Sequence, residues 1–140
     1  KDTFETLLAM GIIPVVNEND TVSVEEIEIG DNDSLSAIVA TVVNADLLVL
    51  FSDIDGLYDS DPRKNSDATL ISRVEDISKI EDSAGGAGTN VGTGGMVTKI
   101  EAAKIANNAG ISMIIANGNN INSLYDIMEG KKVGTLFKAY

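Results

Sequence analysis

The chain has 140 residues, 44% of them hydrophobic, which is enough for one domain with a core of its own. It contains no cysteine and no histidine, which excludes disulfides, cysteine nucleophiles, histidine acid–base catalysis and the usual zinc sites. Its 22 acidic residues against 10 basic ones give a net charge of −12, which argues against binding to nucleic acid or to an anionic membrane.

Helical and strand patterns alternate along the chain, which favours an α/β fold with a mostly parallel sheet. The first helical pattern covers residues 2–10 and stops at Gly11; because the chain starts inside it, we expect a piece of a longer protein. The next predicted elements are a strand at 12–16, a polar loop at 17–23, an edge strand or hairpin at 24–29, a helix from 33, a buried strand at 47–51 and a polar loop at 52–68 with a turn at 61–62. Then follow a short strand at 69–71, a short helix at 76–81, a glycine-rich loop at 84–95, a helix at 96–108 that stops at Gly110, a buried strand at 111–116, a short helix at 122–128 and a last strand at 133–137.

The glycine-rich loop is the first candidate for a site. It contains six glycines and leads into a helix whose first turn carries Thr98 and Lys99. A lysine is unfavourable at the partly positive start of a helix unless an anion binds there, and a glycine loop before a helix suits phosphate. The spacing fits neither the P-loop nor the Rossmann pattern. The alternative interpretation is a flexible linker.

Carboxylates and amides gather at a second candidate site. Asp31, Asn32 and Asp33 precede a helix and exceed what one helix cap needs, although capping alone remains an alternative. Such a cluster suits an amino group or a magnesium ion. Asp53 and Asp55, which follow a predicted strand, are either site residues or turn formers. The two candidate sites together indicate an enzyme that moves a phosphoryl group onto a small substrate.

Four segments, in this order, resemble motifs of the glutamate 5-kinases, a branch of the amino acid kinase family. They are VVNEND at 15–20, GDNDSLSA at 30–37, SDIDGLY at 52–58 and GTGGMVTK at 92–99, and VGTLF at 133–137 also fits. The resemblance covers essentially the whole chain. It implies a three-layer αβα sandwich around an open, mainly parallel sheet. It also implies that residues 1–140 are a single domain, the C-terminal, nucleotide-binding part of a kinase domain.

The resemblance implies transfer of the γ-phosphoryl group of ATP, with Mg²⁺, to the side-chain carboxylate of L-glutamate. This is the first step of proline biosynthesis and would take place in the cytoplasm. Lys99 and Asp33 would be catalytic, with Asp33 orienting Lys99 or a second lysine and not removing a proton. By motif position, the glutamate-binding residues would be Asp20, Asn32 and Asn17. The ATP-binding residues would be Ser52, Asp53, Thr93, Gly94, Gly95, Met96, Val97, Thr98 and Lys99.

The resemblance further implies feedback inhibition by proline, a homo-oligomer and hand-over of the product to glutamyl phosphate reductase. The family's N-terminal part carries a phosphate-contacting lysine and a glycine- and serine-rich substrate loop, and neither occurs in these residues. We therefore expect this chain alone to be inactive or badly weakened. Alternatives are a kinase of the same fold for acetylglutamate, aspartate, carbamate or UMP, a nucleotide- or amino-acid-sensing module, and a structural fragment that only dimerises.

Overall fold

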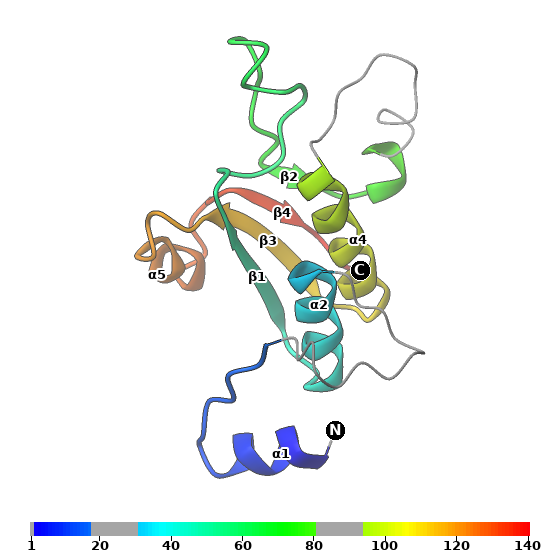
Figure 1. The fold of residues 1–140 in the computed structure, drawn as a ribbon, viewed down its shortest axis with the longest axis vertical. Coiled ribbons are helices and arrows are strands. Elements are labelled where there is room, and N and C mark those ends of the chain that lie inside the picture. Colours follow the sequence, from blue (N-terminus) through cyan, green and yellow to red (C-terminus); the bar gives the residue numbers. More distant parts are fainter. Residues whose placement is uncertain (1, 18–30, 81–93) are drawn as a thin grey trace.

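The computed structural model describes residues 2–17, 31–80 and 94–140 (Figure 1). The helices are α1 (Asp2–Ala9), α2 (Asn32–Val42), α4 (Gly94–Asn108) and α5 (Ser123–Met128), and residues 77–80 form a further helical turn. The strands are β1 (Leu47–Ser52), β2 (Arg73–Val74), β3 (Ser112–Asn117) and β4 (Thr135–Phe137). No helix in these three ranges is both long and apolar enough to cross a membrane.

The four strands form one open sheet in the order β1-β3-β4-β2. β1 runs parallel to β3 and β2 runs parallel to β4, whereas β3 and β4 are antiparallel. The prediction of a mainly parallel sheet is therefore confirmed. Ser52 pairs with Asn117 at the carboxyl ends of β1 and β3, and Ile115 pairs with Thr135 at the amino end of β4. Three segments that are far apart in the sequence thus meet at the end of the sheet where β1 and β3 finish and β4 begins.

Helices α2 and α4 pack against each other and cover one face of the sheet, while α5 lies apart from them beyond β3 (Figure 1). Several side chains that these helices bury are small: Ala37 and Ala40 of α2 and Ala103 and Ala106 of α4. The packing of α2 against α4 matters for function because it fixes the start of α4 relative to the start of α2.

Most predicted elements are confirmed, with ends shifted by one or two residues. The confirmed elements are the helices at 2–10, from 33, at 96–108 and at 122–128, and the strands at 47–51, 111–116 and 133–137. Gly110 ends α4 with a φ of +77°, a conformation that glycine adopts without strain. The turn at Asp61-Pro62 is also confirmed, since the backbone N–H of Lys64 donates to the carbonyl of Asp61 at 3.0 Å.

Two predicted strands are wrong. Residues 12–17 are irregular, with Ile13 86% and Val15 96% exposed. Pro14 lies in the middle of this apolar run and cannot donate to a strand ladder, which opposes a paired strand. The predicted strand at 69–71 is reduced to a single bridge between Leu70 and Tyr58, and the strand that pairs with β4 begins two residues later.

The prediction that β1 is buried on both faces is wrong in degree. Only Leu50 of β1 is buried, because β1 forms an edge of the four-stranded sheet and its other residues are half-buried.

The helix predicted at 76–81 is present at residues 77–80. The edge strand or hairpin at 24–29 and the glycine-rich loop up to residue 93 lie outside the described residues, as does the polar loop beyond Asn17.

Candidate functional site

The first turn of α2 begins at a well-formed cap. The Oδ1 atom of Asp31 accepts a hydrogen bond from the backbone N–H of Ser34 at 2.7 Å, and its Oδ2 atom accepts one from Ser34 Oγ at 3.0 Å. An N-cap carboxylate satisfies a backbone donor that has no partner inside the helix. Asp31 thus has the capping role considered for this cluster, and the cap fixes the position of Asn32 and Asp33 in the turn that follows.

Asp33 is joined by two interactions to the second turn of α4, because this helix begins at Gly94, two residues before the predicted start. The Nζ atom of Lys99 lies 3.0 Å from Oδ2 of Asp33, and Thr98 Oγ1 donates to the same oxygen at 2.8 Å. The side chains of Lys99 and Asp33 are 12% and 23% exposed, so water screens their charges only partly. Of the two lysine partners considered for Asp33 in the sequence, the structure places Lys99 beside it.

The surroundings of Lys99 suit an anion. The first N–H groups of a helix have no partner inside it, and the positive end of the helix dipole adds to their attraction for negative charge. Lys99 adds a full positive charge at the same end of α4, and the Asp33 carboxylate offsets the repulsion between that charge and the dipole. An arriving phosphate would meet a lysine that is already held in position.

The other residues predicted to bind ATP lie at the end of β1. Ser52 Oγ donates to Asp53 Oδ1 at 3.1 Å, and the exposed Asp53 carboxylate lies 3.9 Å from the guanidinium of Arg63. Within the described residues, no hydrogen bond or ion pair joins Ser52 or Asp53 to α4. Among the residues that the structure describes, the two parts of the predicted ATP site are thus not linked by a hydrogen bond or an ion pair.

The side chains at the start of α4 differ in what they offer a ligand. Met96 is only 7% exposed and belongs to the core, so only its backbone is available to a ligand. Val97 is 49% exposed. Gly95 is exposed, and a Cβ atom there would meet nothing within 4 Å. Two other predicted site residues, Thr93 and Asp20, lie outside the described residues.

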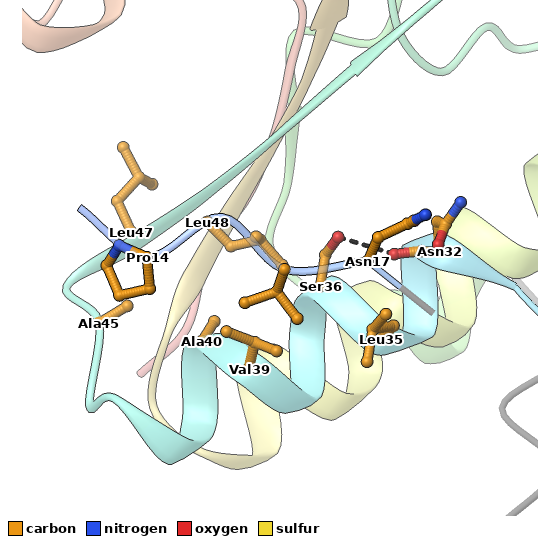
Figure 2. Close-up of a pocket in the computed structure, with 11 residues that line it drawn as sticks. Pro14, Asn17, Asn32, Leu35, Ser36, Val39, Ala40, Ala45, Leu47 and Leu48 are labelled. Atoms are coloured by element: carbon orange, nitrogen blue, oxygen red, sulfur yellow. Dashed lines mark hydrogen bonds between the residues drawn. The ribbon is translucent and has the colours of Figure 1, made fainter. Parts of the chain in front are cut away.

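Asn17 and Asn32, both predicted to bind glutamate, line one pocket of about 370 Å³ (Figure 2). The pocket lies between residues 14–17, α2 and the start of β1. Figure 2 shows the two amides near each other, beside the hydrogen bond of 2.7 Å from Ser36 Oγ to the Asn32 carbonyl. Ser36 also lines the pocket, and the other lining residues are apolar: Pro14, Val16, Leu35, Val39, Ala40, Ala45, Leu47 and Leu48.

One polar connection at the sheet edge was not predicted. Asn117 Nδ2 donates to Asp55 Oδ1 at 2.7 Å, and the Tyr58 hydroxyl donates to Asp55 Oδ2 at 3.1 Å. Burial raises the pKa of Tyr58, and the hydrogen bond to Asp55 and its negative charge raise that pKa further. The sequence did contain a signal for this contact. Asp55 and Asn117 follow the apolar runs at 47–51 and 111–116, which were predicted as strands of a mostly parallel sheet, and the carboxyl ends of neighbouring parallel strands lie close together.

The chain is similar in sequence to proteins named glutamate 5-kinase. The chain is 58% identical over 143 residues to the glutamate 5-kinase of Clostridium perfringens, covering 99% of this chain and 53% of that protein. It is 64% identical over 138 residues to the glutamate 5-kinase of Carboxydothermus hydrogenoformans, covering 98% of this chain and 37% of that protein. The chain therefore spans about half or less of the length of these relatives.

Solved structures support the fold. The isopentenyl phosphate kinase of T. acidophilum matches with a TM-score of 0.70 at 22% identity, covering 98% of this chain and 52% of that one. The UMP kinase of Bacillus anthracis matches with a TM-score of 0.58 at 19% identity, covering 76% and 39%. The model of the amino acid kinase family matches residues 1–117. Both the α/β fold and this match agree with the resemblance seen in the sequence, and the chain belongs to the amino acid kinase family.

Proposed function

We propose that the full-length protein containing this chain transfers the γ-phosphoryl group of ATP to the side-chain carboxylate of L-glutamate. The product is L-glutamyl 5-phosphate, and the reaction is the first step of proline biosynthesis. The observation that carries the proposal is the Lys99–Asp33 ion pair at 3.0 Å at the start of α4. The choice of glutamate is supported by relatives named glutamate 5-kinase at 58% and 64% identity.

This reaction suits a chain without histidine. The side-chain carboxylate of glutamate has a pKa of about 4.3, so it is ionised at neutral pH and needs no general base to become a nucleophile. Asp33 already accepts hydrogen bonds from Lys99 and Thr98 at 3.0 and 2.8 Å. We therefore assign Asp33 the role of orienting Lys99 rather than that of removing a proton.

The main barrier is the repulsion between the glutamate carboxylate and the ATP phosphates. Lys99 and the free N–H groups at the start of α4 would stabilise the charge that develops on the transferred phosphoryl group. A single preorganised contact of this kind typically lowers the barrier by about 2–4 kcal/mol. Ser52 and Asp53 at the end of β1, with residues 93–99, would hold the nucleotide.

Magnesium would accompany ATP. The described residues contain no group of three or more acidic side chains placed to hold a metal ion. Mg²⁺ at phosphoryl-transfer sites usually needs only one or two carboxylates besides the phosphates, and the exposed carboxylate of Asp53 is of the right chemical type. When bound, the ion would neutralise phosphate charge.

Glutamate would be recognised by residues that come before α2 in the sequence and by the first residue of α2. Asn17 and Asn32, which line one pocket, would bind polar groups of glutamate, and Asp20 would pair with its ammonium group. In this proposal residues 1–140 are a single domain that forms the nucleotide-binding part of the kinase. A cytoplasmic homo-oligomer, inhibition by proline and hand-over to glutamyl phosphate reductase complete the proposal.

Trapping with hydroxylamine tests the proposed reaction. The full-length protein is incubated with Mg-ATP, L-glutamate and hydroxylamine, alongside Lys99→Ala and the surface control Lys132→Ala. We expect glutamate-dependent hydroxamate from the unaltered protein and from Lys132→Ala, and little from Lys99→Ala. Phosphorylation of acetylglutamate, aspartate, carbamate or UMP in place of glutamate would assign another acceptor. ATP binding without any transfer would instead support a sensing module.

A further inference from the structure

Thr135 is a buried polar residue that the proposed reaction does not use. Its side chain is fully buried, and its Oγ1 atom makes two short hydrogen bonds to distant backbone groups. It accepts from the N–H of Leu57 at 2.8 Å and donates to the carbonyl of Ile71 at 2.6 Å. Leu57 and Ile71 are also joined directly, since Ile71 N–H donates to the Leu57 carbonyl at 2.8 Å. One hydroxyl thus connects β4 to both ends of the loop at 58–70.

Two glycines let the chain approach Thr135 closely. A Cβ atom on Gly56 would lie 2.5 Å from Thr135 Oγ1. A Cβ atom on Gly134 would lie 1.9 Å from the carbonyl oxygen of Ile115 and 3.0 Å from that of Asp55. Neither position has room for a side chain, so the segment at 53–57 lies directly on the β3–β4 ladder and cannot shift without breaking these contacts.

This segment begins with Asp53 and directly follows Ser52, and we proposed above that both residues bind ATP. Its start is fixed by the pairing of Ser52 with Asn117 in the sheet and by a 2.7 Å hydrogen bond from Gly118 N–H to the Ser52 carbonyl. Its end is fixed by the hydrogen bond from Leu57 N–H to Thr135 Oγ1 and by the 2.8 Å bond from Ile71 N–H to the Leu57 carbonyl. The segment is therefore held at both ends, and among the described residues Thr135 is the side chain that bonds to the backbone of both Leu57 and Ile71.

We infer that Thr135 is a positioning residue for the nucleotide: its hydroxyl helps to fix the end of the segment at residues 53–57 and thereby the placement of Asp53, while Ser52 is held by the sheet. This inference rests on the proposed function. A valine in its place has almost the same shape but leaves the N–H of Leu57 and the carbonyl of Ile71 buried without a partner. A serine keeps the hydroxyl and loses only a methyl group.

Steady-state kinetics of three variants of the full-length protein test the inference. We expect Thr135→Val to raise KM for ATP about tenfold, in line with an unpaired buried group, and to leave KM for glutamate nearly unchanged. Thr135→Ser restores KM for ATP to near its original value. Ile111→Ala, at the amino end of β3, removes buried apolar atoms far from the loop and controls for a general loss of stability. A rise of both KM values together, or an equal rise in Ile111→Ala, would overturn the inference.

Hydrogen exchange gives a second test that needs no variant. The amide of Leu57 should be protected from exchange in the unaltered protein before ATP is added, because its partner is the buried Thr135 hydroxyl. Rapid exchange that slows only when ATP binds would overturn the inference. Failure of the proposed function is distinguishable from this, because it would appear as absence of ATP turnover in the unaltered protein while Leu57 remains protected.

Discussion

The Nζ atom of Lys99 lies 3.0 Å from Oδ2 of Asp33, so an ion pair between residues 66 apart in the sequence joins the first turn of α2 to the second turn of α4. Neither helix places these groups on its own. The cap at Asp31 fixes the start of α2, and the packing of α2 against α4 brings the starts of the two helices together. Lys99 is held by the Asp33 carboxylate and, at 3.4 Å, by the Gly95 carbonyl.

Loss of the Lys99 charge should abolish most of the activity with little effect on folding. We expect Lys99→Ala to lower kcat about 10²–10³-fold, the usual effect of removing one electrostatic contact to a transition state. Lys99→Arg keeps the charge but not its position, and should recover only part of the rate. The measurement is kcat at saturating ATP and glutamate, with circular dichroism to check folding. A kcat within twofold of the unaltered protein for Lys99→Ala would remove Lys99 from the mechanism.

Thr98 supports the same carboxylate and should matter less. Its hydroxyl donates to Asp33 Oδ2 at 2.8 Å, so Thr98→Val removes one of two donors that hold Asp33. We expect kcat to fall about threefold to tenfold, the usual value of one hydrogen bond. Thr98→Ser keeps the donor and should retain nearly full kcat. If the valine and serine variants have the same kcat, the hydroxyl has no role in positioning Asp33.

The helices and central strands could be predicted because their apolar spacing is local. The pattern of Ile100, Ala103 and Ala106 in α4 shows which face is buried, and all three side chains are buried in the structure. The run at 12–16 failed because an apolar run becomes a strand only where a neighbour pairs with it, and Pro14 opposes such pairing. Edge or central position in a sheet is a property of the tertiary structure that spacing does not encode.

The site could be predicted only in part, because contacts between distant elements are not encoded in local spacing either. The motifs identified Asp33 and Lys99, and their proximity followed from assigning them a shared role. The second donor to Asp33, Thr98, and the bond between Asn117 and Asp55 depend on side-chain geometry across elements more than 60 residues apart. Thr135 was hidden inside a segment that was interpreted only as a strand.

Asp31 should contribute to stability as a helix cap. Asp31→Ala removes the acceptor for Ser34 N–H, which lies 2.7 Å from Oδ1, and should lower the free energy of unfolding by about 1 kcal/mol. Asp31→Asn keeps a capping oxygen and should lose much less. Urea unfolding monitored by circular dichroism gives both values. Equal losses for alanine and asparagine would show that the carboxylate acts through its charge rather than as a cap.

Tyr58 should titrate above the ordinary range of a tyrosine. Burial raises its pKa above the ordinary value of about 10, and the hydrogen bond and charge of Asp55 raise it further. Because the folded-state pKa exceeds the unfolded one, the stability contributed by this group is present below pH of about 10 and is lost as the pH rises through the folded pKa. The difference in tyrosinate absorbance between the protein and Tyr58→Phe isolates this titration. Asp55→Asn removes the charge and should lower the pKa; an unchanged pKa would exclude the contribution of Asp55.

Two glycines with similar backbone angles should respond very differently to alanine. Gly110 and Gly134 have φ values of +77° and +61°, which are unfavourable for alanine at a cost of about 1–2 kcal/mol. A Cβ atom on Gly110 would meet nothing within 4 Å, whereas one on Gly134 would lie 1.9 Å from the backbone oxygen of Ile115. We therefore expect Gly110→Ala to show only the conformational cost, and Gly134→Ala to lose about 2–5 kcal/mol in total because overpacking adds to it. Thermal unfolding of the two variants measures the difference. Equal shifts in Tm would mean that β3 and β4 separate easily at Gly134, and that the tight junction beneath residues 53–57 does not restrain the loop.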